Sequence, residues 1–503
     1  MNNEAENISL SKTVFLRSVT QCALSGFLHF KKPELRKPIS SELQAIFDEG
    51  TYVGKVARDL FRGGIDVIQS AKISGLTEFE ETERLLASGA EILYEAAFQT
   101  PDRLHKCRVD ILVRIKDRTD LYEVKSSTKF KMPQHLYDLG YQYWVIMQTG
   151  LISKLNAHIC HINKEYVAGE NIDIDELFTS EDVTKRVKNS QPLIERMLLE
   201  FHNTLNRKSA PQVNMGQHCV KPYPCEFFVH CKSKLPEFSV FDIGGIRKTK
   251  AEQLIEKGIV DVNQLSEKEK LSQKQWTEVE AAITNRAKIK KAAILKELKS
   301  YCLDEDVYFA DFETTTSAIP IYAGTRPYQH LCFQYCALFR PANKQTYQRF
   351  DFLAMPGEDP RRAFIESFLR DTPGAGKIIA YNAKFEIEKL GGLATEFPEY
   401  SHSIKDRIDR MVDLAVIFKE RYYYSPLQRG EASLKAITPI LAPHLSYKSL
   451  AIQNGQMAMT AYRQLPSMNP AEQLKVIANL KEYCHLDVLT MKEIISALQK
   501  LCK

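Results

Sequence analysis

Five side chains near the C-terminal end of the sequence have types and spacings that suit phosphoryl-transfer chemistry. Asp311 and Glu313 lie two residues apart in VYFADFETTT, so on a strand both would point to the same face. Glu386 follows an apolar run in KIIAYNAKFEIEKL, near the predicted start of a helix. Tyr483 and Asp487 in KEYCHLDVLTM are four residues apart and would share one helix face. Such acids can hold two divalent cations that clamp the attacking and leaving oxygens of a phosphate, and the tyrosine could orient the attacking water.

A second group of charged residues lies in the N-terminal half, on two predicted strands. The stretches CRVDILVRI and LYEVKSS flank the turn KDRTD and predict a β-hairpin. Glu123 and Lys125 would share one face, and Asp110 lies on the neighbouring strand. Two carboxylates can bind a divalent cation, and the lysine could stabilise charge that develops on a phosphate. A hairpin face held by salt bridges is the alternative that this spacing leaves open.

Three cysteines, Cys219, Cys225 and Cys231, stand within thirteen positions in QHCVKPYPCEFFVHCK. The stretch MNNEAENISLSK lacks the regions of a signal peptide, and no apolar run reaches the length of a membrane span. We therefore expect a cytoplasmic protein with no membrane partner. Thiols in that compartment stay reduced, which favours metal binding or catalysis over disulfide formation. Ordinary buried thiols are the alternative.

The elements that must position these residues divide the 503-residue chain into three predicted regions. Residues 1–235 end with the cysteines, 236–300 are charged and helical in pattern, and 301–503 begin on the strand of Asp311 and end on a long helix. The composition, 44% hydrophobic and 26% charged, is that of a globular protein. A net charge of +5 permits a nucleic-acid partner without indicating one. GAGK at 374–377 does not fit a phosphate-binding P-loop, so no ATPase of its own is visible.

The middle region contains FDIGGIRKTKAEQLIEKGIVDVNQLS, which resembles a helix-hairpin-helix motif. In that motif glycines let backbone N–H groups approach a DNA phosphate. The resemblance makes Gly244, Gly245, Lys248 and Lys250 the candidate nucleic-acid contacts. A plain helical spacer is the alternative.

The N-terminal hairpin and its surroundings resemble the core of PD-(D/E)XK nucleases, in particular the RecB-like branch. The resemblance implies a restriction-endonuclease-like fold in which Asp110, Glu123 and Lys125 form the catalytic group. Glu95, in ILYEAAF, stands where that branch often has an acidic residue. The later stretch HLYDLGYQYWVIMQTG is similar to the helix that follows the core, and it offers Gln142 and Tyr143 as further candidates.

The cysteines are similar in arrangement to those of a RecB-like subgroup that includes AddB and the nucleases of CRISPR spacer acquisition. In that subgroup one cysteine before the core and three after it hold a 4Fe–4S cluster. The resemblance assigns this role to Cys22, in TQCALSGFLHF, together with Cys219, Cys225 and Cys231. The first gap in the trio is longer than is common in the subgroup, so Zn²⁺ is the alternative.

The C-terminal region resembles DEDD exonucleases on an RNase H-like fold, in the variety with Tyr-x3-Asp. Asp311 and Glu313 match the first motif, and Tyr483 with Asp487 matches the third. Glu386 stands where the second motif usually has aspartate. The stretch YYYSPLQRGEASLK looks like a loop and helix over the site. The whole chain also resembles a bacterial two-domain family of unknown function.

Together these resemblances imply an α/β multidomain fold with a restriction-endonuclease-like core, a small helix-hairpin-helix segment and an RNase H-like mixed-sheet domain. They imply a nuclease that uses Mg²⁺ or Mn²⁺ to hydrolyse DNA at ends, flaps or single strands, with RNA as an alternative substrate. The C-terminal half would remove nucleotides from a 3′ end, in repair, processing or defence, and a separate helicase is a potential partner. A nucleic-acid-binding scaffold with one or both nuclease-like domains inactive is the alternative, and cleavage by the N-terminal half alone is a third hypothesis.

Overall fold

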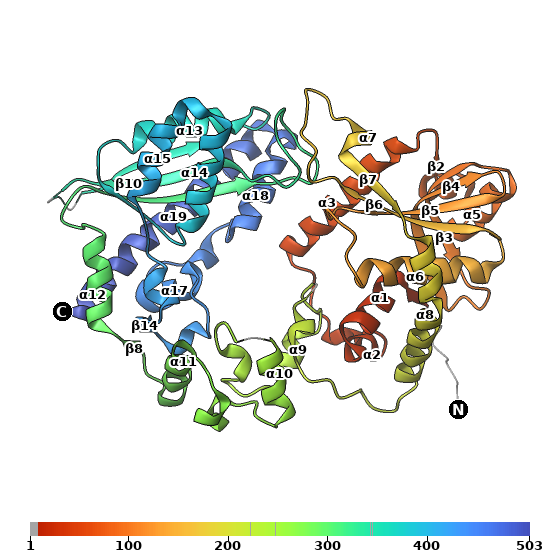
Figure 1. Ribbon diagram of the computed structural model, residues 1–503, viewed down its shortest axis with the longest axis horizontal. Helices are drawn as coiled ribbons and strands as arrows, with labels where there is room; N and C mark the ends of the chain where they lie inside the picture. Colours follow the sequence, from red (N-terminus) through yellow and green to blue (C-terminus); the bar gives the residue numbers. More distant parts are fainter. Residues whose placement is uncertain (1–8, 222, 247, 343, 345) are drawn as a thin grey trace. The chain divides into compact units, whose positions relative to one another are not determined.

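The computed structural model describes residues 9–503 apart from 222, 247, 343 and 345 (Figure 1). The chain is a mixed α/β, multidomain protein that divides into two compact units. Unit 1 comprises Met1–Lys234 and Ser317–Gln329, and unit 2 comprises Leu235–Thr316 and His330–Lys503. The predicted helical region 236–300 is therefore part of unit 2. Among the described helices, none combines the length and the apolar character that crossing a membrane requires.

Unit 1 is built on a seven-stranded mixed sheet with the order β2-β3-β4-β5-β6-β7, in which β1 also pairs with β4. β3, β4 and β5 are antiparallel neighbours, whereas β5 and β6 run parallel. The strands are β1 (Leu10–Ser11), β2 (Ile65–Asp66), β3 (Ile92–Gln99), β4 (His105–Ile115), β5 (Arg118–Lys125), β6 (Leu155–Ile162) and β7 (Phe178–Asp182). The α-helices are α1 (Lys12–Leu16), α2 (Ala23–Lys31), α3 (Ser41–Ala57), α4 (Val67–Ser74), α5 (Glu78–Ala87), α6 (Gln134–Thr149), α7 (Ile174–Leu177), α8 (Thr184–Leu205) and α9 (Phe228–Lys232).

The predicted N-terminal hairpin is confirmed, with a tighter turn than the sequence indicated. β4 and β5 pair antiparallel up to Ile115 and Arg118, so only Lys116 and Asp117 lie between them. Alternate residues of β4 from 107 to 111 are buried, as a strand with a period of two requires. The hairpin therefore carries its charged residues at fixed positions in the middle of the sheet.

Unit 2 contains a five-stranded sheet with the order β11-β10-β9-β12-β13. β9, β10 and β11 are antiparallel, and β9, β12 and β13 are parallel. Its strands are β8 (Lys288–Ile289), β9 (Val307–Thr315), β10 (Leu331–Arg340), β11 (Gln348–Leu353), β12 (Lys377–Ala380), β13 (Met411–Asp413) and β14 (Tyr423–Tyr424). Its α-helices are α10 (Lys248–Glu256), α11 (Gln273–Thr284), α12 (Lys291–Ser300), α13 (Pro360–Asp371), α14 (Lys384–Glu396), α15 (Ser401–Arg410), α16 (Val416–Lys419), α17 (Leu434–Leu441), α18 (Gly455–Gln464) and α19 (Pro470–Cys502).

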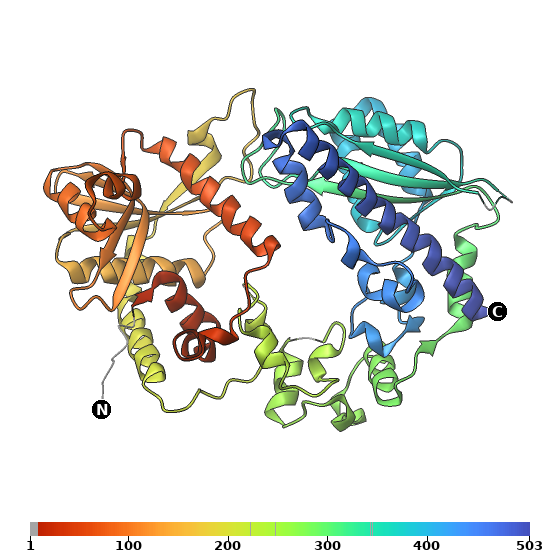
Figure 2. The ribbon, with the colours of Figure 1, turned by 180° about the vertical axis from the view of Figure 1, so that it is seen from behind.

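The central strand β9 separates two apolar cores of unit 2. Tyr308, Ala310 and Phe312 pack in the core that also contains residues of α13, α14 and α15. Val307 and Phe309 pack in the core that contains residues of α12, α17 and α19, and Figure 2 shows α19 running along the sheet. Because side chains alternate along a strand, Asp311 and Glu313 share the face of Val307 and Phe309 and lie on the α19 side. The predicted strand around Asp311 and the predicted C-terminal helix are both confirmed.

The segment Ser317–Gln329 follows β9 along the chain but packs within unit 1. Its Ala318 and Ile319 are buried in a core of unit 1 that also contains residues of β3, β4 and β6. Two backbone hydrogen bonds join the segment to Ala168, one from the N–H of Gly324 (2.8 Å) and one to the carbonyl of Thr325 (2.9 Å). Unit 1 is therefore completed by a segment that lies between two strands of unit 2 in the sequence.

Candidate functional site

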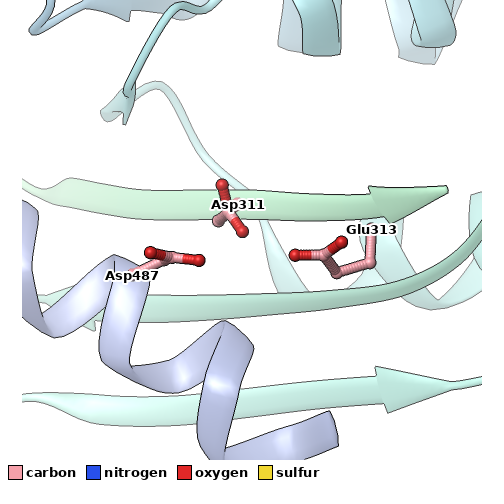
Figure 3. Close-up of side chains that lie close together, drawn as sticks. All are labelled: Asp311, Glu313 and Asp487. Atoms are coloured by element: carbon pink, nitrogen blue, oxygen red, sulfur yellow. The ribbon is translucent and has the colours of Figure 1, made fainter. Parts of the chain in front are cut away.

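Three carboxylates of unit 2 meet where α19 packs beside β9. Asp311 and Glu313 extend from β9 and Asp487 extends from α19, and one oxygen from each lies within 4.8 Å of the other two (Figure 3). Glu313 and Asp487 are buried, and Asp311 is half-buried. In the described part of the chain, this is the one group of three or more potential metal-ligating residues that approach so closely. We call these three residues the acid cluster.

The packing of α19 fixes Asp487 opposite β9. Cys484, Val488 and Met491 of this helix are fully buried in the core that contains Val307 and Phe309. The Cys484 thiol lies 3.5 Å from the carbonyl oxygen of Asp311, so this part of the helix lies against the strand. One helical turn separates Cys484 from Asp487, and the same packing therefore brings Asp487 to the acid cluster.

Burial raises the pKa of each acid in the cluster, and the charge of Asp487 raises the pKa values of the other two further. Burial, followed by the charge of Asp487, raises the pKa of Asp311 well above its ordinary value and that of Glu313 to about 8. Burial raises the pKa of Asp487 to about 6, although a hydrogen bond from Tyr447 and the charge of Lys435 act in the opposite direction. Ionising all three acids is therefore unfavourable without a cation, and a bound cation would relieve the repulsion.

Glu386 lies in the first turn of α14, directly after β12 and its connecting turn. It is buried, and its Oε2 has no hydrogen-bond partner. Burial, opposed by the residue's own backbone N–H, raises the pKa of Glu386 to about 8. The charge of Glu386 also contributes to the raised pKa values of Asp311 and Glu313. Glu386 is thus near the acid cluster without being one of the three residues whose oxygens meet.

Tyr483 is buried beside the acid cluster, one turn before Asp487 on α19. Burial and the charges of Asp487 and Glu313 raise the pKa of Tyr483, so the phenol stays protonated. Lys435 of α17 lies with its Nζ 3.3 Å from the Tyr483 hydroxyl. The Tyr447 hydroxyl donates to Asp487 Oδ1. Sequence reasoning placed the stretch that ends at Lys435 over the site but did not select Lys435, and it missed Tyr447, which no local pattern marks.

The predicted site of unit 1 brings together Asp110, Glu123 and Lys125 on the paired strands β4 and β5. Lys125 Nζ lies 2.5 Å from Glu123 Oε1, so the two side chains do share a face. Asp110 Oδ2 accepts the backbone N–H of Val124 at 2.7 Å. Burial and the charge of Glu123 raise the pKa of Asp110 to about 7, although Lys125 acts in the opposite direction.

Three further residues complete this group. One of them, Gln142, was proposed from the sequence together with Tyr143, which is not one of the three. Asp138 on α6 pairs with Lys125 (2.6 Å), and Gln142 donates to both Glu123 (2.7 Å) and Asp138 (2.9 Å). Lys12, at the start of α1, lies 2.9 Å from Glu123 Oε1. Burial alone would raise the pKa of Asp138, but the two lysines outweigh burial and lower it.

A cavity of about 650 Å³ opens over Asp110, Glu123 and Lys125. Glu95 also lines it, as the resemblance implied for an acidic residue upstream of the hairpin. Its backbone has a φ of 57°, in the left-handed region, and its carboxylate pairs with Arg58 at 3.1 Å. The structure therefore places all four predicted residues of the N-terminal site around one cavity, with Glu95 held by an arginine.

The four predicted cysteines belong to unit 1 and lie close enough to influence one another. The pKa of Cys22 is raised by burial and, more weakly, by Cys225 and Cys219. The pKa of Cys219 is raised by burial and by Cys225 and Cys231, and that of Cys231 by burial, Cys225 and Cys22. The structure thus brings Cys22, which precedes the core in sequence, to the three cysteines that follow it. In their deprotonated form the four thiolates would repel one another, and a positively charged metal bound between the sulfurs would offset this repulsion.

The candidate nucleic-acid contacts of the middle region are arranged differently from the prediction. The N–H of Gly244 donates to Glu278 at 2.6 Å, and an added side-chain carbon would lie 2.4 Å from a backbone oxygen. Gly244 therefore serves the internal packing of unit 2, and its N–H is not available to a phosphate. Gly245 is exposed with a φ of 64°, and Lys250 is half-buried. The side chain of Lys248 lies outside the described part of the chain.

Comparison with known proteins gives two matches. The family model described as "Domain of unknown function (DUF2779)" matches residues 308–433, a range that includes Asp311, Glu313 and Glu386 but ends before α17 and α19. The "Uncharacterized protein MG366" of Mycoplasma genitalium is 29% identical over 218 residues, which cover 39% of this chain and 32% of that protein. The chain thus spans about a third of the length of this relative. Both matches agree with the predicted resemblance to a bacterial family of unknown function, and neither description names an activity.

Proposed function

We propose that unit 2 is a metal-dependent nuclease that hydrolyses phosphodiester bonds, acting as an exonuclease from the 3′ end of DNA. The observation that carries the proposal is the acid cluster, in which oxygens of Asp311, Glu313 and Asp487 lie within 4.8 Å of one another in a largely buried setting. Carboxylate oxygens are the ligands that Mg²⁺ and Mn²⁺ prefer. Glu386 would complete the ligand set, because its buried Oε2 has no partner.

Divalent cations in this site would polarise the phosphate, lower the pKa of a bound water and stabilise the leaving oxygen. The chain's own residues would position the reactants. Tyr483 keeps its proton and can donate a hydrogen bond to the attacking water. Lys435, 3.3 Å from the Tyr483 hydroxyl, holds the phenol in place and adds a positive charge near the phosphate.

The topology of unit 2 supports this assignment. An RNase H-like fold has a mixed sheet in which a central strand carries acids and is flanked by antiparallel strands on one side and parallel strands on the other. The order β11-β10-β9-β12-β13, with the acids on β9, agrees with that arrangement. In the same way, the β4–β5 hairpin followed by α6 and the parallel strand β6 agrees with a restriction-endonuclease-like core.

The four cysteines of unit 1 would hold a 4Fe–4S cluster, with zinc as the alternative. Four thiolates suit both groups. Such a group would join the start of the chain to the segment around residue 225.

A second candidate function, nucleic-acid binding without cleavage, is favoured for unit 1 by one observation. The carboxylates Glu123 and Asp138 are already neutralised by Lys12 and Lys125. Hydrolysis by unit 1 would need a cation to enter this paired group, whereas binding of a nucleic acid would not. Unit 1 is therefore the weaker candidate for catalysis, and unit 2 is the stronger.

The test is degradation of end-labelled single-stranded DNA, double-stranded DNA and RNA with Mg²⁺ or Mn²⁺, using anaerobically purified full-length protein. Asp311→Asn is expected to abolish a stepwise ladder from the 3′ end, and Lys125→Met to leave it. Asp371→Asn is a matched control, because Asp371 is a buried carboxylate of unit 2 that bonds Tyr335 and lies outside the acid cluster. An inert wild type, or cleavage that survives Asp311→Asn, contradicts the proposal.

A further inference from the structure

Both oxygens of Glu123 and both oxygens of Asp138 in the unit 1 site are engaged by lysine or amide groups of the same chain. Lys12 Nζ contacts both oxygens of Glu123, at 2.9 and 3.1 Å, and Asp138 Oδ1 at 3.3 Å. Lys125 contacts the Oε1 of Glu123 and the Oδ2 of Asp138, and Gln142 contacts the remaining oxygen of each. A divalent cation that used Glu123 as a ligand would have to take oxygens that Lys12 now holds.

Lys12 is held in this position by its surroundings and is not a mobile surface lysine. Burial alone would lower its pKa, but Asp138 and Glu123 outweigh burial and raise it well above the ordinary value, so the side chain is an ammonium ion. It lines the same cavity as Asp110 and Glu123, and Asp110 contributes to raising its pKa. The ammonium group therefore lies among the same three carboxylates that would attract a metal ion.

The backbone on either side of Lys12 is anchored to the elements that carry the acids. The preceding strand β1 pairs in parallel with β4, the strand of Asp110. The hydroxyl of Tyr141 on α6 donates to the carbonyl of Leu10 at 2.7 Å, and the Tyr141 ring stacks on Phe15 with centroids 4.6 Å apart. The same helix α6 carries Asp138 and Gln142. The chain thus builds a fixed support for an ammonium group at this point.

We propose that Lys12 is an internal counter-cation of the unit 1 site. The site binds a divalent cation only when the Lys12 ammonium group moves away from Glu123 and Asp138. The inference rests on the proposed assignment of Asp110 and Glu123 as cation ligands. The ammonium group offsets the repulsion between these carboxylates, but unlike a metal ion it has no open coordination position for water or phosphate. Lys12 is a positioning residue in this account, and it sets whether unit 1 is open to a metal.

The test counts Mn²⁺ ions bound by full-length protein, measured by electron paramagnetic resonance of free Mn²⁺, in the Asp311→Asn background that disables the acid cluster. Adding Lys12→Met is expected to tighten Mn²⁺ binding at one further site by at least about tenfold, because a positive charge leaves the ligand oxygens. Lys12→Arg, which keeps the charge, should not do so. Lys55→Met is the matched control, since Lys55 lines the same cavity.

Adding Glu123→Gln to the Lys12→Met protein should remove the gained ion, which locates it. The inference is overturned if Lys12→Met binds Mn²⁺ no more tightly than its parent, or if the parent already binds a full equivalent that Glu123→Gln removes. Lys12→Gln, which keeps a hydrogen-bond donor, replaces Lys12→Met if thermal melting shows that the methionine variant does not fold. No nucleic acid is present, so failure of the proposed exonuclease activity leaves this result unchanged.

Discussion

Replacing Glu313 with glutamine, in protein kept free of divalent cations, is expected to stabilise the fold. Burial and the charge of Asp487 raise the pKa of Glu313 from its ordinary value of 4.5 to about 8. The folded chain therefore holds a proton on Glu313 that the unfolded chain has lost above pH 4.5. The free energy of unfolding therefore falls as the pH rises above about 4.5, and this loss is complete above about pH 8. Glutamine is uncharged at every pH and nearly the same size.

The magnitude follows from the pKa of Glu313. A pH of 7 is 2.5 units above the ordinary pKa of 4.5 that the carboxyl has in the unfolded chain. At 1.36 kcal/mol per unit, the raised pKa therefore lowers the free energy of unfolding by about 3 kcal/mol at pH 7. At pH 5 the same calculation gives about 1 kcal/mol. A domain of 150–250 residues gains roughly 2–4 °C in melting temperature per kcal/mol. Glu313→Gln should therefore raise the melting temperature by roughly 6–12 °C at pH 7 and by no more than about 4 °C at pH 5.

The assay is thermal unfolding followed by circular dichroism, in EDTA at pH 5 and pH 7 and then with saturating Mg²⁺ at pH 7. Mg²⁺ should raise the melting temperature of the wild type, because it binds the folded state, and should have little effect on Glu313→Gln. The matched control is Asp371→Asn, which alters a buried carboxylate that accepts the hydroxyl of Tyr335 at 2.6 Å. This control should melt at a lower temperature than the wild type at both pH values and should keep the response to Mg²⁺.

Two results would refute the reasoning. In the first, Glu313→Gln melts at or below the wild-type temperature at pH 7 in EDTA, which would mean that the carboxylate is stabilised as an anion without a metal. In the second, the gain is the same at pH 5 and pH 7, which would assign it to packing or to the unfolded chain and not to charge.

Three other expectations follow from the same contacts. The affinity of the acid cluster for Mn²⁺ should increase by up to about tenfold per pH unit between pH 6 and 8, because the raised pKa of Glu313 means that a proton leaves as the cation binds. Calorimetry in two buffers with different ionisation enthalpies measures the released proton. An affinity that does not change with pH contradicts this expectation. Cys231→Ser should lower the bound iron or zinc measured by elemental analysis, while Cys302→Ser should retain it. A fragment of residues 1–234 should unfold in urea with a free energy about 2 kcal/mol lower than the same fragment fused to residues 317–329, because Ile319 is buried in the core of unit 1. Equal stability of the two fragments contradicts this expectation.

Local patterns were enough to predict the elements that carry the acids. The apolar run around Asp311 predicts a strand, the helical spacing of apolar residues around Asp487 predicts a helix, and two short strand patterns joined by a turn predict the hairpin of Glu123. Each element is found where its pattern placed it. Spacing along one element also fixed which side chains share a face. The pairs Asp311 with Glu313 and Glu123 with Lys125 follow directly from the alternation of a strand.

Contacts between distant parts of the chain could not be predicted in this way. Lys12 reaches Glu123 across 111 positions, and neither its own short helix nor its neighbours carry a pattern that indicates a partner. The Gly244 turn has the local sequence of a phosphate-binding hairpin, but whether its N–H is free depends on Glu278, which lies 34 positions later. Residues 317–329 were expected with the C-terminal region, yet their apolar side chains are buried in unit 1.

The two candidate sites differ in how far positively charged side chains offset the charge of their carboxylates. In unit 1, Glu123 and Asp138 are paired with two lysines, and the pKa of Asp138 is lowered despite its burial. In unit 2, the positive charge of Lys435 acts to lower the pKa values of Glu313 and Asp487, but burial outweighs it and both pKa values remain raised. A buried group of acids without matching cations is stable at neutral pH only with bound protons or a bound metal. We therefore propose that the acid cluster is the site that needs a divalent ion from solution, whereas in the unit 1 site Lys12 and Lys125 already pair with Glu123 and Asp138.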